Sequence, residues 1–593
     1  MTTRPAEVGD RRRRRQAVLI AVMTVIFFFG GRLVYVQALQ GPDLAAEARD
    51  SRTRTSDIRA PRGNIVDADG EVLATSVERY NVGVNQQLVR NYVRKDPETG
   101  EVLGTGAAEA AEVLAPLLDR DKAELGAELV GDSTFVYLAK GLTPEQWREI
   151  EALNIPGIEP EETTERLYPN GSTAGNIIGF VGREGQGLAG LELTFDEQLT
   201  GTDGSLTVEI GGTGQVIPTG LREEVPAEPG QTVHTTIDRD LQYFAQQSVD
   251  EAVAKWGAQW GAVVVEEVGT GRILAIADSN TVDPNNYQDW DQADWGSRAV
   301  QAPYEPGSTG KLPTFAAALE EDAVETDTVF TVPDTLTMPN GQTFSDNDDH
   351  PTEQLTTTGI LTDSSNTGTV QIGDLIDDRV RYGYLRAFGF GEKTGIELPG
   401  ETSGVLREPE SWDSRTRYTT MFGQGMSVSL LQNTSMVATL GNGGVRMDPH
   451  IVDGLTDGEG EFAPTEVGEG ERVVSEETAD QMVAMMESVA ADGGTGVLGQ
   501  VEGYRVAAKT GTAQIVDGSG GLSNRLGSYV GLAPAEDPKV AVGVVMYKPP
   551  GMSYGGVIAA PVFSEVTGFA LRQMGVPPST TPPAMLARTP GEG

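Results

Sequence analysis

The chain has 593 residues, a formal net charge of −43, three histidines and no cysteine. This length predicts more than one domain, and the acidic charge argues against a nucleic-acid partner, because a phosphate backbone needs a basic face. The lack of cysteine excludes thiol nucleophiles, disulfides and thiolate metal sites. The histidines His234, His350 and His450 are not spaced as a metal cluster, so we expect no metal and no cofactor.

The N-terminal segment has the pattern of a membrane anchor. Residues 11–15 are consecutive arginines and residues 17–36 are almost entirely apolar, long enough as a helix to cross about 30 Å of hydrocarbon. Because basic residues stay on the cytoplasmic side, we expect a cytoplasmic basic tail (1–16), one transmembrane helix (17–36) and an extracytoplasmic remainder. The alternative is a cleaved signal peptide, but the small-residue site Ala46-Glu47-Ala48 lies far beyond the apolar run, which favours an uncleaved anchor.

Residues 37–230 have a mixed, turn-rich pattern. Asp69-Gly70 separates the apolar runs 64–66 and 72–74, which predicts a β-hairpin. Residues 107–118 and 144–153 favour helices.

From residue 231 the pattern changes to that of an α+β domain. An amphipathic helix is predicted over 238–256, and the apolar runs 262–267 and 272–277 are split by Gly269-Thr270-Gly271, a hairpin pattern. Two further strands are predicted at 528–533 and 540–547, followed by a closing helix at 560–574. This order indicates an antiparallel sheet with helices in a domain that spans 231–576. Residues 577–593 are rich in proline and threonine, which predicts a disordered tail.

Only one of the nine lysines has a serine three positions before it, in Ser308-Thr309-Gly310-Lys311. On a helix that spacing places both side chains on one face. A serine needs a nearby base to act as a nucleophile, and a lysine can be that base when burial lowers its pKa. Alone, the pattern is more typical of a helix cap followed by a surface lysine. Pro313 should kink or irregularise the first turns of this helix.

Two more motifs make the catalytic interpretation stronger. Ser364-Ser365-Asn366 lies in a polar stretch, which by itself is also typical of a plain loop. Lys509-Thr510-Gly511-Thr512 lies within an extended pattern at 505–516, and Gly511 would let a substrate backbone come close. A second Lys-Thr-Gly begins at Lys393, but it lies in a glycine-dense turn, so we choose Lys509 for the site.

In this order the three motifs resemble those of the penicillin-binding protein and serine β-lactamase superfamily. Further segments resemble class B penicillin-binding proteins, most closely the septal cell-division branch: Arg62-Gly63-Asn64-Ile65-Val66-Asp67, Arg166-Leu167-Tyr168-Pro169, Gly187-Leu188-Ala189-Gly190-Leu191-Glu192, Phe422-Gly423-Gln424-Gly425, Gln432 and 392–400. The resemblance implies a single N-terminal transmembrane helix, a mixed pedestal (dimerisation-type) domain at 37–230 and a penicillin-binding/serine β-lactamase-like transpeptidase domain. In the last of these, a central antiparallel sheet is flanked by helices.

The resemblance also implies a role for each motif residue. Ser308 would be the acylated nucleophile, Lys311 would take its proton, and Ser364 would relay a proton to the leaving nitrogen. Asn366, which would hold the donor peptide by its amide, and Lys509, which would supply positive potential, complete the catalytic set. The substrate-binding set is Thr510, Gly511 and Thr512, in which the two threonines would bind the terminal carboxylate. The backbone N–H groups of Ser308 and Thr512 would form the oxyanion hole.

The activity so implied is that of a peptidoglycan D,D-transpeptidase, which cross-links stem peptides through a Ser308 acyl-enzyme, releases D-alanine and is inhibited by β-lactams. Nothing before residue 230 is typical of a glycosyltransferase domain. The resemblance implies that the partners are a polytopic membrane glycosyltransferase and other division proteins, at the cell membrane. Two alternatives stay open: a D,D-carboxypeptidase or β-lactamase-type hydrolase with the same serine, and a non-catalytic penicillin-binding scaffold or sensor.

Overall fold

The computed structural model describes residues 9–40, 52–212, 215–515, 524–549 and 554–591 and divides into two compact units. The smaller unit contains residues 1–60, 78–165 and 202–228, and the larger unit contains residues 61–77, 166–201 and 229–593. From the sequence we expected one boundary near residue 230. That boundary stays a prediction, and the segments 61–77 and 166–201 before it belong to the larger compact unit.

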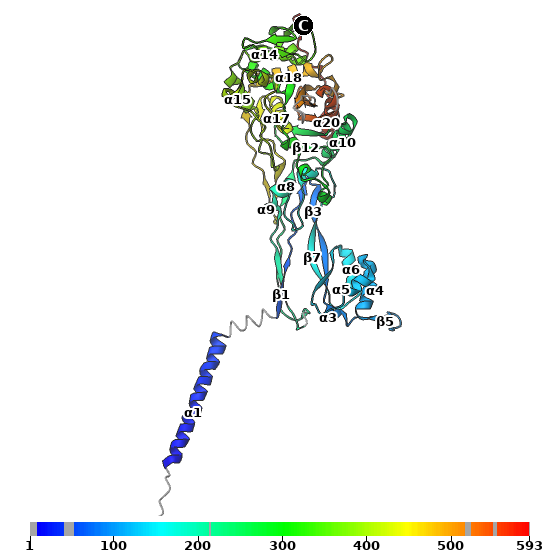
Figure 1. Cartoon of the computed structure of the whole chain (residues 1–593), viewed down its shortest axis with the longest axis vertical. Helices are drawn as coiled ribbons and strands as arrows, with labels where there is room; N and C mark the ends of the chain where they lie inside the picture. The colour runs from blue at the N-terminus through cyan, green and yellow to red at the C-terminus, as the bar shows by residue number, and fades with distance from the viewer. Residues whose placement is uncertain (1–8, 41–51, 213–214, 516–523, 550–553, 592–593) are drawn as a thin grey trace, which may run out of the picture. The chain divides into compact units, whose positions relative to one another are not determined.

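The N-terminal helix α1 (Gly9–Val34) continues as a π-helical turn, Tyr35–Leu39. Its apolar side chains are exposed, with Phe27 at 77 %, and an 18-residue window within the helical stretch Arg11–Ala38 has a mean hydropathy of 2.3. Such a surface is suited to the hydrocarbon of a bilayer, so the helix fits the predicted membrane anchor (Figure 1). Residues 1–8 of the predicted tail and the alternative cleavage site at 46–48 lie outside the described residues.

The smaller unit has two parts. One is a three-stranded antiparallel sheet of β1 (Thr53–Ile58), β8 (Gly204–Glu209) and β9 (Arg222–Val225). The other has its own apolar core and is built from α3 (Gln86–Val89), α4 (Gly106–Leu118), α5 (Lys122–Glu128), α6 (Pro144–Ala152), β6 (Val136–Leu142) and the hairpin of β4 (Val93–Lys95) and β5 (Val102–Thr105). Helices α4 and α6 confirm the two helices predicted here, and a capping box of Thr143 and Gln146 starts α6.

A five-stranded antiparallel sheet forms the centre of the larger unit. Its strands, in order across the sheet, are β12 (Ile273–Asp278), β11 (Trp260–Glu267), β23 (Val540–Tyr547), β22 (Asn524–Ala533) and β21 (Ala507–Ile515). The predicted hairpin and the two predicted late strands are confirmed. The edge strand β21 carries Lys509, which places that lysine at a border of the sheet.

Helices cover both faces of this sheet, because alternate residues of a strand point to opposite sides. Val263 and Val265 of β11 pack in one apolar core with α10 (Arg239–Trp256) and α20 (Ala560–Gln573), which lie side by side in Figure 1. Ala262 and Val264 belong to the opposite core, which includes α12 (Lys311–Glu320), α17 (Leu430–Gly441) and α18 (Glu476–Ala490). The predicted helices at 238–256 and 560–574 are confirmed by α10 and α20.

A second sheet and several short elements complete the larger unit. The predicted hairpin at Asp69-Gly70 is confirmed by the antiparallel pairing of β2 (Ile65–Val66) with β3 (Val72–Val84). The other elements of the described residues are β7 (Ile158–Leu167), β10 (Thr232–Thr235), β13 (Val329–Val332), β14 (Thr335–Thr337), β15 (Thr343–Ser345), β16 (Glu353–Thr356), β17 (Val445–Arg446), β18 (Val452–Thr456), β19 (Phe462–Pro464), β20 (Glu471–Arg472), α7 (Gly175–Ile178), α8 (Gly190–Thr194), α9 (Asp196–Leu199), α11 (Arg298–Gln301), α13 (Thr357–Thr362), α14 (Asn366–Gly373), α15 (Asp378–Ala387), α16 (Thr416–Thr419) and α19 (Gly555–Ile558), with 3-10 turns between them.

The segments that resemble pedestal motifs meet at one buried carboxylate, Glu192. Arg62 Nε lies 2.6 Å from Glu192 Oε2 and Arg166 Nε lies 2.7 Å from Glu192 Oε1, with side-chain exposures of 9, 4 and 0 % for Arg62, Arg166 and Glu192. The Tyr168 hydroxyl also donates to Glu192 Oε1 (3.2 Å). Charges of opposite sign therefore compensate one another inside this cluster, which is the condition for burying them.

The segment after α20 lies along the larger unit. Ser579 Oγ accepts the N–H of Arg505 (2.9 Å), Leu586 packs against the main apolar core, and the Arg588 carbonyl accepts the N–H of Thr356 (3.0 Å). From its composition we expected a disordered tail at 577–593. The structure gives residues 577–591 these partners, and an extended, proline-rich backbone offers its carbonyls freely to neighbouring elements.

Candidate active site

Ser308 lies in a 3-10 turn, Gly307–Gly310, that leads directly into α12. We expected an irregular start to this helix, and the 3-10 turn provides it. Pro313 is the third residue of α12, within the first turn, where a proline is tolerated. Gly307 has a φ of +56°, and a Cβ there would lie 2.6 Å from the Thr512 carbonyl oxygen. Glycine is therefore required for the turn to approach β21 this closely.

The turn leaves Ser308 partly accessible and buries the residues that follow it. Ser308 is half-buried, whereas Thr309, Gly310 and Lys311 are buried. Thr309 Oγ1 donates to the Pro306 carbonyl (2.9 Å) and accepts from the Asn433 side chain (3.0 Å). The serine is thus accessible on a turn that is fixed from behind.

Lys311 points from α12 toward Ser364. Its side chain is fully buried, and its Nζ donates to the Ser364 carbonyl and lies 3.4 Å from Ser364 Oγ. Burial lowers the pKa of Lys311 to about 7, and the carboxylate of Asp346 acts in the opposite direction. A lysine with this pKa is partly neutral near neutral pH and can accept a proton.

Lys509 reaches the same serine from β21. Its side chain is also fully buried, and its Nζ donates to Ser364 Oγ (2.9 Å) and to the Thr510 carbonyl (3.2 Å). Burial and the neighbouring cation of Lys311 lower the pKa of Lys509 well below its ordinary value. Two lysines from distant parts of the sequence therefore share one hydroxyl.

Ser364 has a left-handed backbone, with a φ of +58°, directly after α13. Its N–H donates to the Leu361 carbonyl (3.2 Å) and that of Ser365 donates to the Ile360 carbonyl (3.0 Å), the pattern of a Schellman motif. Glycine is the usual residue at this position, because a side chain costs about 1–2 kcal/mol in the left-handed region. Serine here gains a hydroxyl that glycine cannot offer to Lys509.

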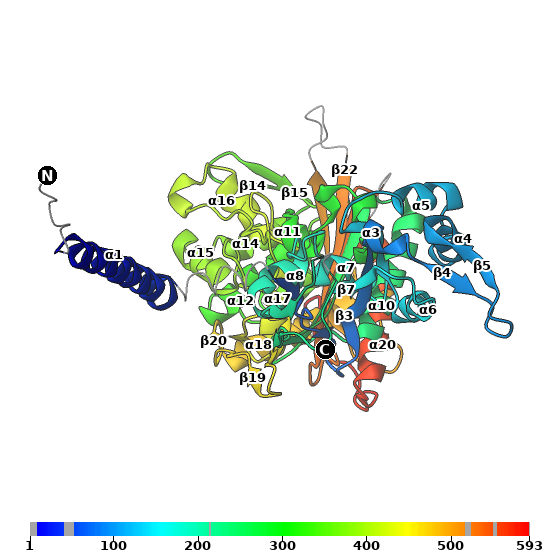
Figure 2. The ribbon, with the colours of Figure 1, turned by 90° about the horizontal axis from the view of Figure 1, so that it is seen from below.

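Asp346, which the sequence analysis missed, holds the segment that carries Asn366. Its Oδ1 accepts the N–H groups of Asn366 and of Thr367 (2.9 Å), and its Oδ2 accepts the hydroxyl of Ser365 (2.6 Å). These groups are at the start of α14, where a carboxylate is favourable. The Asn366 amide donates to the Ser345 carbonyl (3.2 Å), and β15 lies beside α14 (Figure 2).

The motif on β21 places Thr510 and Thr512 two positions apart, so they share one face of the strand. Thr510 Oγ1 donates to Thr495 Oγ1 (3.3 Å), and Thr512 Oγ1 accepts the N–H of Gly555 (3.3 Å). Between them, a Cβ on Gly511 would lie 2.9 Å from the Pro306 carbonyl oxygen. Thr495 could not be predicted from the sequence either, since a single threonine in a loop carries no motif.

The second Lys-Thr-Gly forms a turn away from these contacts. Lys393 is exposed, and both the N–H and the hydroxyl of Thr394 donate to Glu401 Oε1. Gly395 donates its N–H to the other oxygen of the same carboxylate (3.2 Å). The glycine-dense pattern predicted a turn here, and the Glu401 carboxylate holds that turn.

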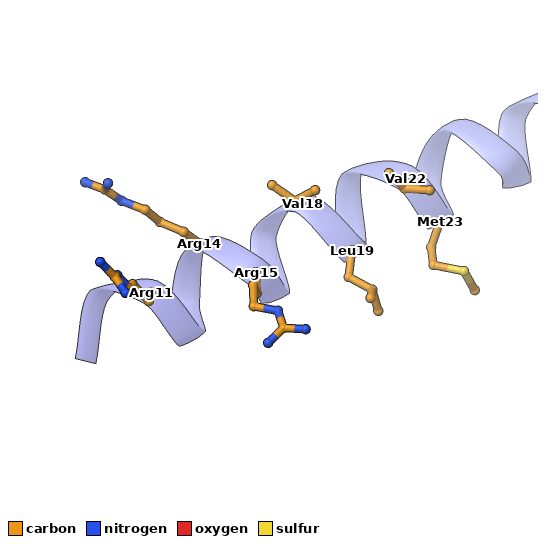
Figure 3. Close-up of a pocket in the computed structure, with 7 residues that line it drawn as sticks. All are labelled: Arg11, Arg14, Arg15, Val18, Leu19, Val22 and Met23. Carbon is orange, nitrogen blue, oxygen red and sulfur yellow. The ribbon is translucent and has the colours of Figure 1, made fainter. Parts of the chain in front are cut away.

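A hollow along α1 contains none of these residues. It is lined by arginines and then by apolar side chains of the same helix: Arg11, Arg14, Arg15, Val18, Leu19, Val22 and Met23 (Figure 3). A change from basic to apolar side chains is typical of the end of a membrane-spanning helix. We therefore relate this surface to anchoring and not to catalysis.

The geometry defines a class of site: an accessible serine on a rigid turn, a buried lysine of lowered pKa, and a second lysine that meets the first at a shared hydroxyl. This arrangement suits nucleophilic acyl transfer. Residues 261–568 match the penicillin-binding protein transpeptidase domain and residues 57–235 match the penicillin-binding protein dimerisation domain. The chain belongs to the penicillin-binding protein transpeptidase family, and the class B resemblance and the α+β fold predicted from the sequence are confirmed.

Named relatives cover nearly the whole chain. Penicillin-binding protein PbpB of Mycolicibacterium smegmatis is 36 % identical over 587 residues, which is 94 % of this chain and 90 % of that protein. Peptidoglycan D,D-transpeptidase FtsI of Escherichia coli is 32 % identical over 562 residues, with 92 and 90 % covered. The crystal structure of penicillin-binding protein 3 from Mycobacterium tuberculosis with aztreonam has a TM-score of 0.68 and 29 % identity, and covers 90 % of this chain and 100 % of that chain.

Proposed function

We propose that this chain is a membrane-anchored peptidoglycan D,D-transpeptidase that cross-links stem peptides through an acyl-enzyme on Ser308. The observation that carries the proposal is the convergence of Lys311 and Lys509 on Ser364 Oγ, at 3.4 and 2.9 Å. The name of the FtsI relative gives the same activity for that protein.

Acylation begins with attack of Ser308 Oγ on the carbonyl carbon of the penultimate D-alanine of a donor stem. As the new C–O bond forms, neutral Lys311 takes the hydroxyl proton. The tetrahedral intermediate then collapses, the peptide C–N bond breaks, and Ser364 passes a proton to the departing D-alanine nitrogen. Lys311 Nζ lies 3.4 Å from Ser364 Oγ, so the proton has a short route from the base through this hydroxyl to the leaving group.

Deacylation reverses these roles. The amine of a neighbouring stem attacks the ester carbonyl, the bond to Ser308 Oγ breaks, and the serine recovers its proton as the new amide forms. Asn366 would hold the donor peptide, and Lys509, Thr510 and Thr512 would hold its terminal carboxylate. The backbone N–H groups of Ser308 and Thr512 would stabilise the oxyanion, which the close approach of Gly307 to Thr512 supports.

Penicillin-binding transpeptidases bind β-lactams and peptidoglycan substrates, and aztreonam is bound in the Mycobacterium tuberculosis structure. A β-lactam would open on Ser308 as the donor stem does. Its leaving nitrogen stays tethered to the acyl group, so no fragment departs to make room for the acceptor amine.

The setting proposed for this activity is the dividing cell surface. The arginines at residues 11–15 would keep the N-terminus in the cytoplasm and the larger unit outside, with residues 17–36 as the anchor and the smaller unit as part of a pedestal. A septal role fits the FtsI and PbpB relatives. The proposed partners are a polytopic membrane glycosyltransferase, which would supply glycan chains, and other division proteins.

Product analysis tests the proposal against its alternatives. The full chain in detergent is incubated with a synthetic D-Ala-D-Ala stem and a stem with a free acceptor amine, and products are separated by liquid chromatography and weighed. We expect cross-linked dimer plus D-alanine, and neither product from Ser308→Ala. Trimmed monomer alone would support the hydrolase, and equal product from Ser308→Ala would exclude Ser308 as the nucleophile.

A further inference from the structure

The segment after α20 passes close to the catalytic residues, and nothing in the motifs predicts a role for it. We propose that Arg588 is a positioning residue, which holds the helix that ends at Ser364 and the loop that contacts Thr510 in their catalytic arrangement. The inference rests on the acyl-enzyme function proposed above.

The segment is tied to the larger unit before it reaches Arg588. The Tyr504 hydroxyl donates to the Val576 carbonyl (2.7 Å), and Arg505 Nη1 donates to Thr581 Oγ1 (2.9 Å). The N–H of Ala584 donates to Glu487 Oε2 (3.0 Å) on α18. These backbone and side-chain contacts fix the path of the segment that leads to Arg588.

At its end the segment clamps the start of α13. Thr356, the N-cap residue of α13, donates its N–H to the Arg588 carbonyl (3.0 Å) and its hydroxyl to the Ala587 carbonyl (2.6 Å). The contact is tight, because a Cβ on Gly359 would lie 2.1 Å from the Arg588 carbonyl oxygen. Any side chain at position 359 would therefore force the two segments apart.

The Arg588 side chain clamps the other end of the same helix. Its Nη2 pairs with Asp363, the residue immediately before Ser364, and its Nη1 donates to the Gly493 carbonyl (3.1 Å). Two residues after Gly493, the hydroxyl of Thr495 donates to the Thr362 carbonyl (3.3 Å) and accepts from Thr510 (3.3 Å). One guanidinium therefore connects the Ser364 side of the site to the Lys509-Thr510 side.

This connection matters because Ser364 is held in an unfavourable conformation. A serine keeps a left-handed backbone only where its surroundings hold it there. At Ser364 the Schellman hydrogen bonds and the Arg588–Asp363 ion pair at the preceding residue do so. Catalytic rates are sensitive to displacements of about 1 Å in such groups. Release of Asp363 would let the Ser364 hydroxyl move away from Lys509.

The test measures acylation of the full-length chain by a fluorescent penicillin, in wild type and in Arg588→Ala. Active sites are counted by the labelling end point, and the rate of the covalent step is measured at saturating probe. We expect that step to slow by about tenfold in Arg588→Ala, less than the roughly 10²-fold that a full 1 Å displacement can cost, with the end point unchanged. Met585→Ala is the matched control, since Met585 lies in the same segment with 56 % exposure, and should acylate at the wild-type rate.

A purely structural role would lower the number of active sites or the melting temperature but leave the covalent step unchanged in the folded fraction. Asp363→Asn removes the ion pair and leaves the backbone contacts of the segment in place, so it serves if Arg588→Ala does not fold. We expect Asp363→Asn to slow the step as well, and the double variant to be no slower than the slower single variant. Wild-type rates in Arg588→Ala and Asp363→Asn would overturn this inference alone, whereas a wild type that is not labelled would overturn the proposed function.

Discussion

The larger unit buries two pairs of cations in opposite ways. Arg62 and Arg166 both pair with Glu192, at 2.6 and 2.7 Å. Lys311 and Lys509 are buried at least as deeply, but within the described part of the chain their Nζ groups meet hydroxyl and carbonyl oxygens and no carboxylate within ion-pair distance.

The difference separates a structural use of buried charge from a chemical one. A buried cation with a carboxylate partner keeps its charge and joins distant segments. A buried cation without a carboxylate partner has a lowered pKa and releases its proton more readily, which is what a catalytic base requires. Arginine suits the first use because its pKa stays above about 12, and lysine suits the second because its pKa shifts readily.

The largest effect is expected from Lys311. We expect Lys311→Ala to slow acylation by a β-lactam by about 10²–10⁴-fold, the usual contribution of a general base. Lys311→Arg should be as slow, because arginine retains the charge but cannot accept the proton. Stopped-flow fluorescence with a labelled penicillin gives the rates.

Lys393→Ala is the control for the first prediction, since Lys393 begins the second Lys-Thr-Gly but is exposed, and it should acylate normally. Near-normal acylation in Lys311→Arg would mean that the charge of Lys311, and not its proton transfer, is what the site uses.

Removing the carboxylate that pairs with Arg62 and Arg166 should lower the stability of the fold and leave the acylation rate unchanged. Glu192→Gln removes the carboxylate that pairs with the buried guanidinium of Arg166 and leaves Arg62 with Asp196 alone (2.8 Å), so we expect a loss of about 3–5 kcal/mol in the free energy of unfolding. Denaturant unfolding monitored by tryptophan fluorescence measures it, with the exposed Glu223→Gln as control. The covalent step per active site should stay at the wild-type value, and a selective loss of that step would contradict the structural role.

Glu266 on β11 extends the comparison to a buried acid. It is 1 % exposed and accepts only the Ser435 hydroxyl (2.6 Å) among the hydrogen bonds of the described residues, and burial raises its pKa from 4.5 to about 8. The folded chain then keeps a proton that the unfolded chain releases, so this group's contribution to stability falls as pH rises from about 4.5 to about 8.

Glu266→Gln should remove that fall. Relative to wild type, the variant should gain a few kcal/mol in the free energy of unfolding between pH 5 and pH 8, at about 1.4 kcal/mol per pKa unit. Urea unfolding of both proteins across this range provides the difference. A difference that does not change with pH would mean that Glu266 is ionised in the folded chain.

The pH dependence of acylation tests the lysine pair without a mutation. Lys311 has a pKa lowered to about 7 and must be neutral to act as a base, so the acylation rate should rise about tenfold per pH unit below pH 7 and level off above it. Rates from pH 5 to pH 9 are compared with melting temperatures in the same buffers. A limb near the ordinary lysine pKa would contradict the lowered value.

The smallest expected change in free energy is at Ser364. Ser364→Gly relieves the left-handed strain, so it should stabilise the folded chain by about 1 kcal/mol. It also removes the hydroxyl that accepts Lys509, and acylation should slow. Thermal melting and labelling on the same sample show both effects, and a variant that is destabilised would contradict the account of the backbone.

The sequence predicted the parts of the fold that periodicity determines, such as α10 and the β11–β12 hairpin. It also predicted the residues that meet at Ser364, because their chemistry requires particular side chains at particular spacings. Long-range contacts were not predictable. No local sequence pattern distinguishes Asp346 from the acidic residues around it, or Arg588 from any other arginine in a proline-rich segment. The interleaving of the two units has the same origin, since a continuous reading of the chain cannot show that residues 166–201 return to pack with the larger unit.

The most direct test of the proposed function is to find where a β-lactam attaches. The purified full chain is reacted with a penicillin, weighed intact and then digested, and the modified peptide is sequenced by mass spectrometry, with Ser308→Ala treated in parallel. We expect one adduct per chain, located on Ser308, and none on the variant. An adduct on another residue, or equal modification of Ser308→Ala, would contradict it.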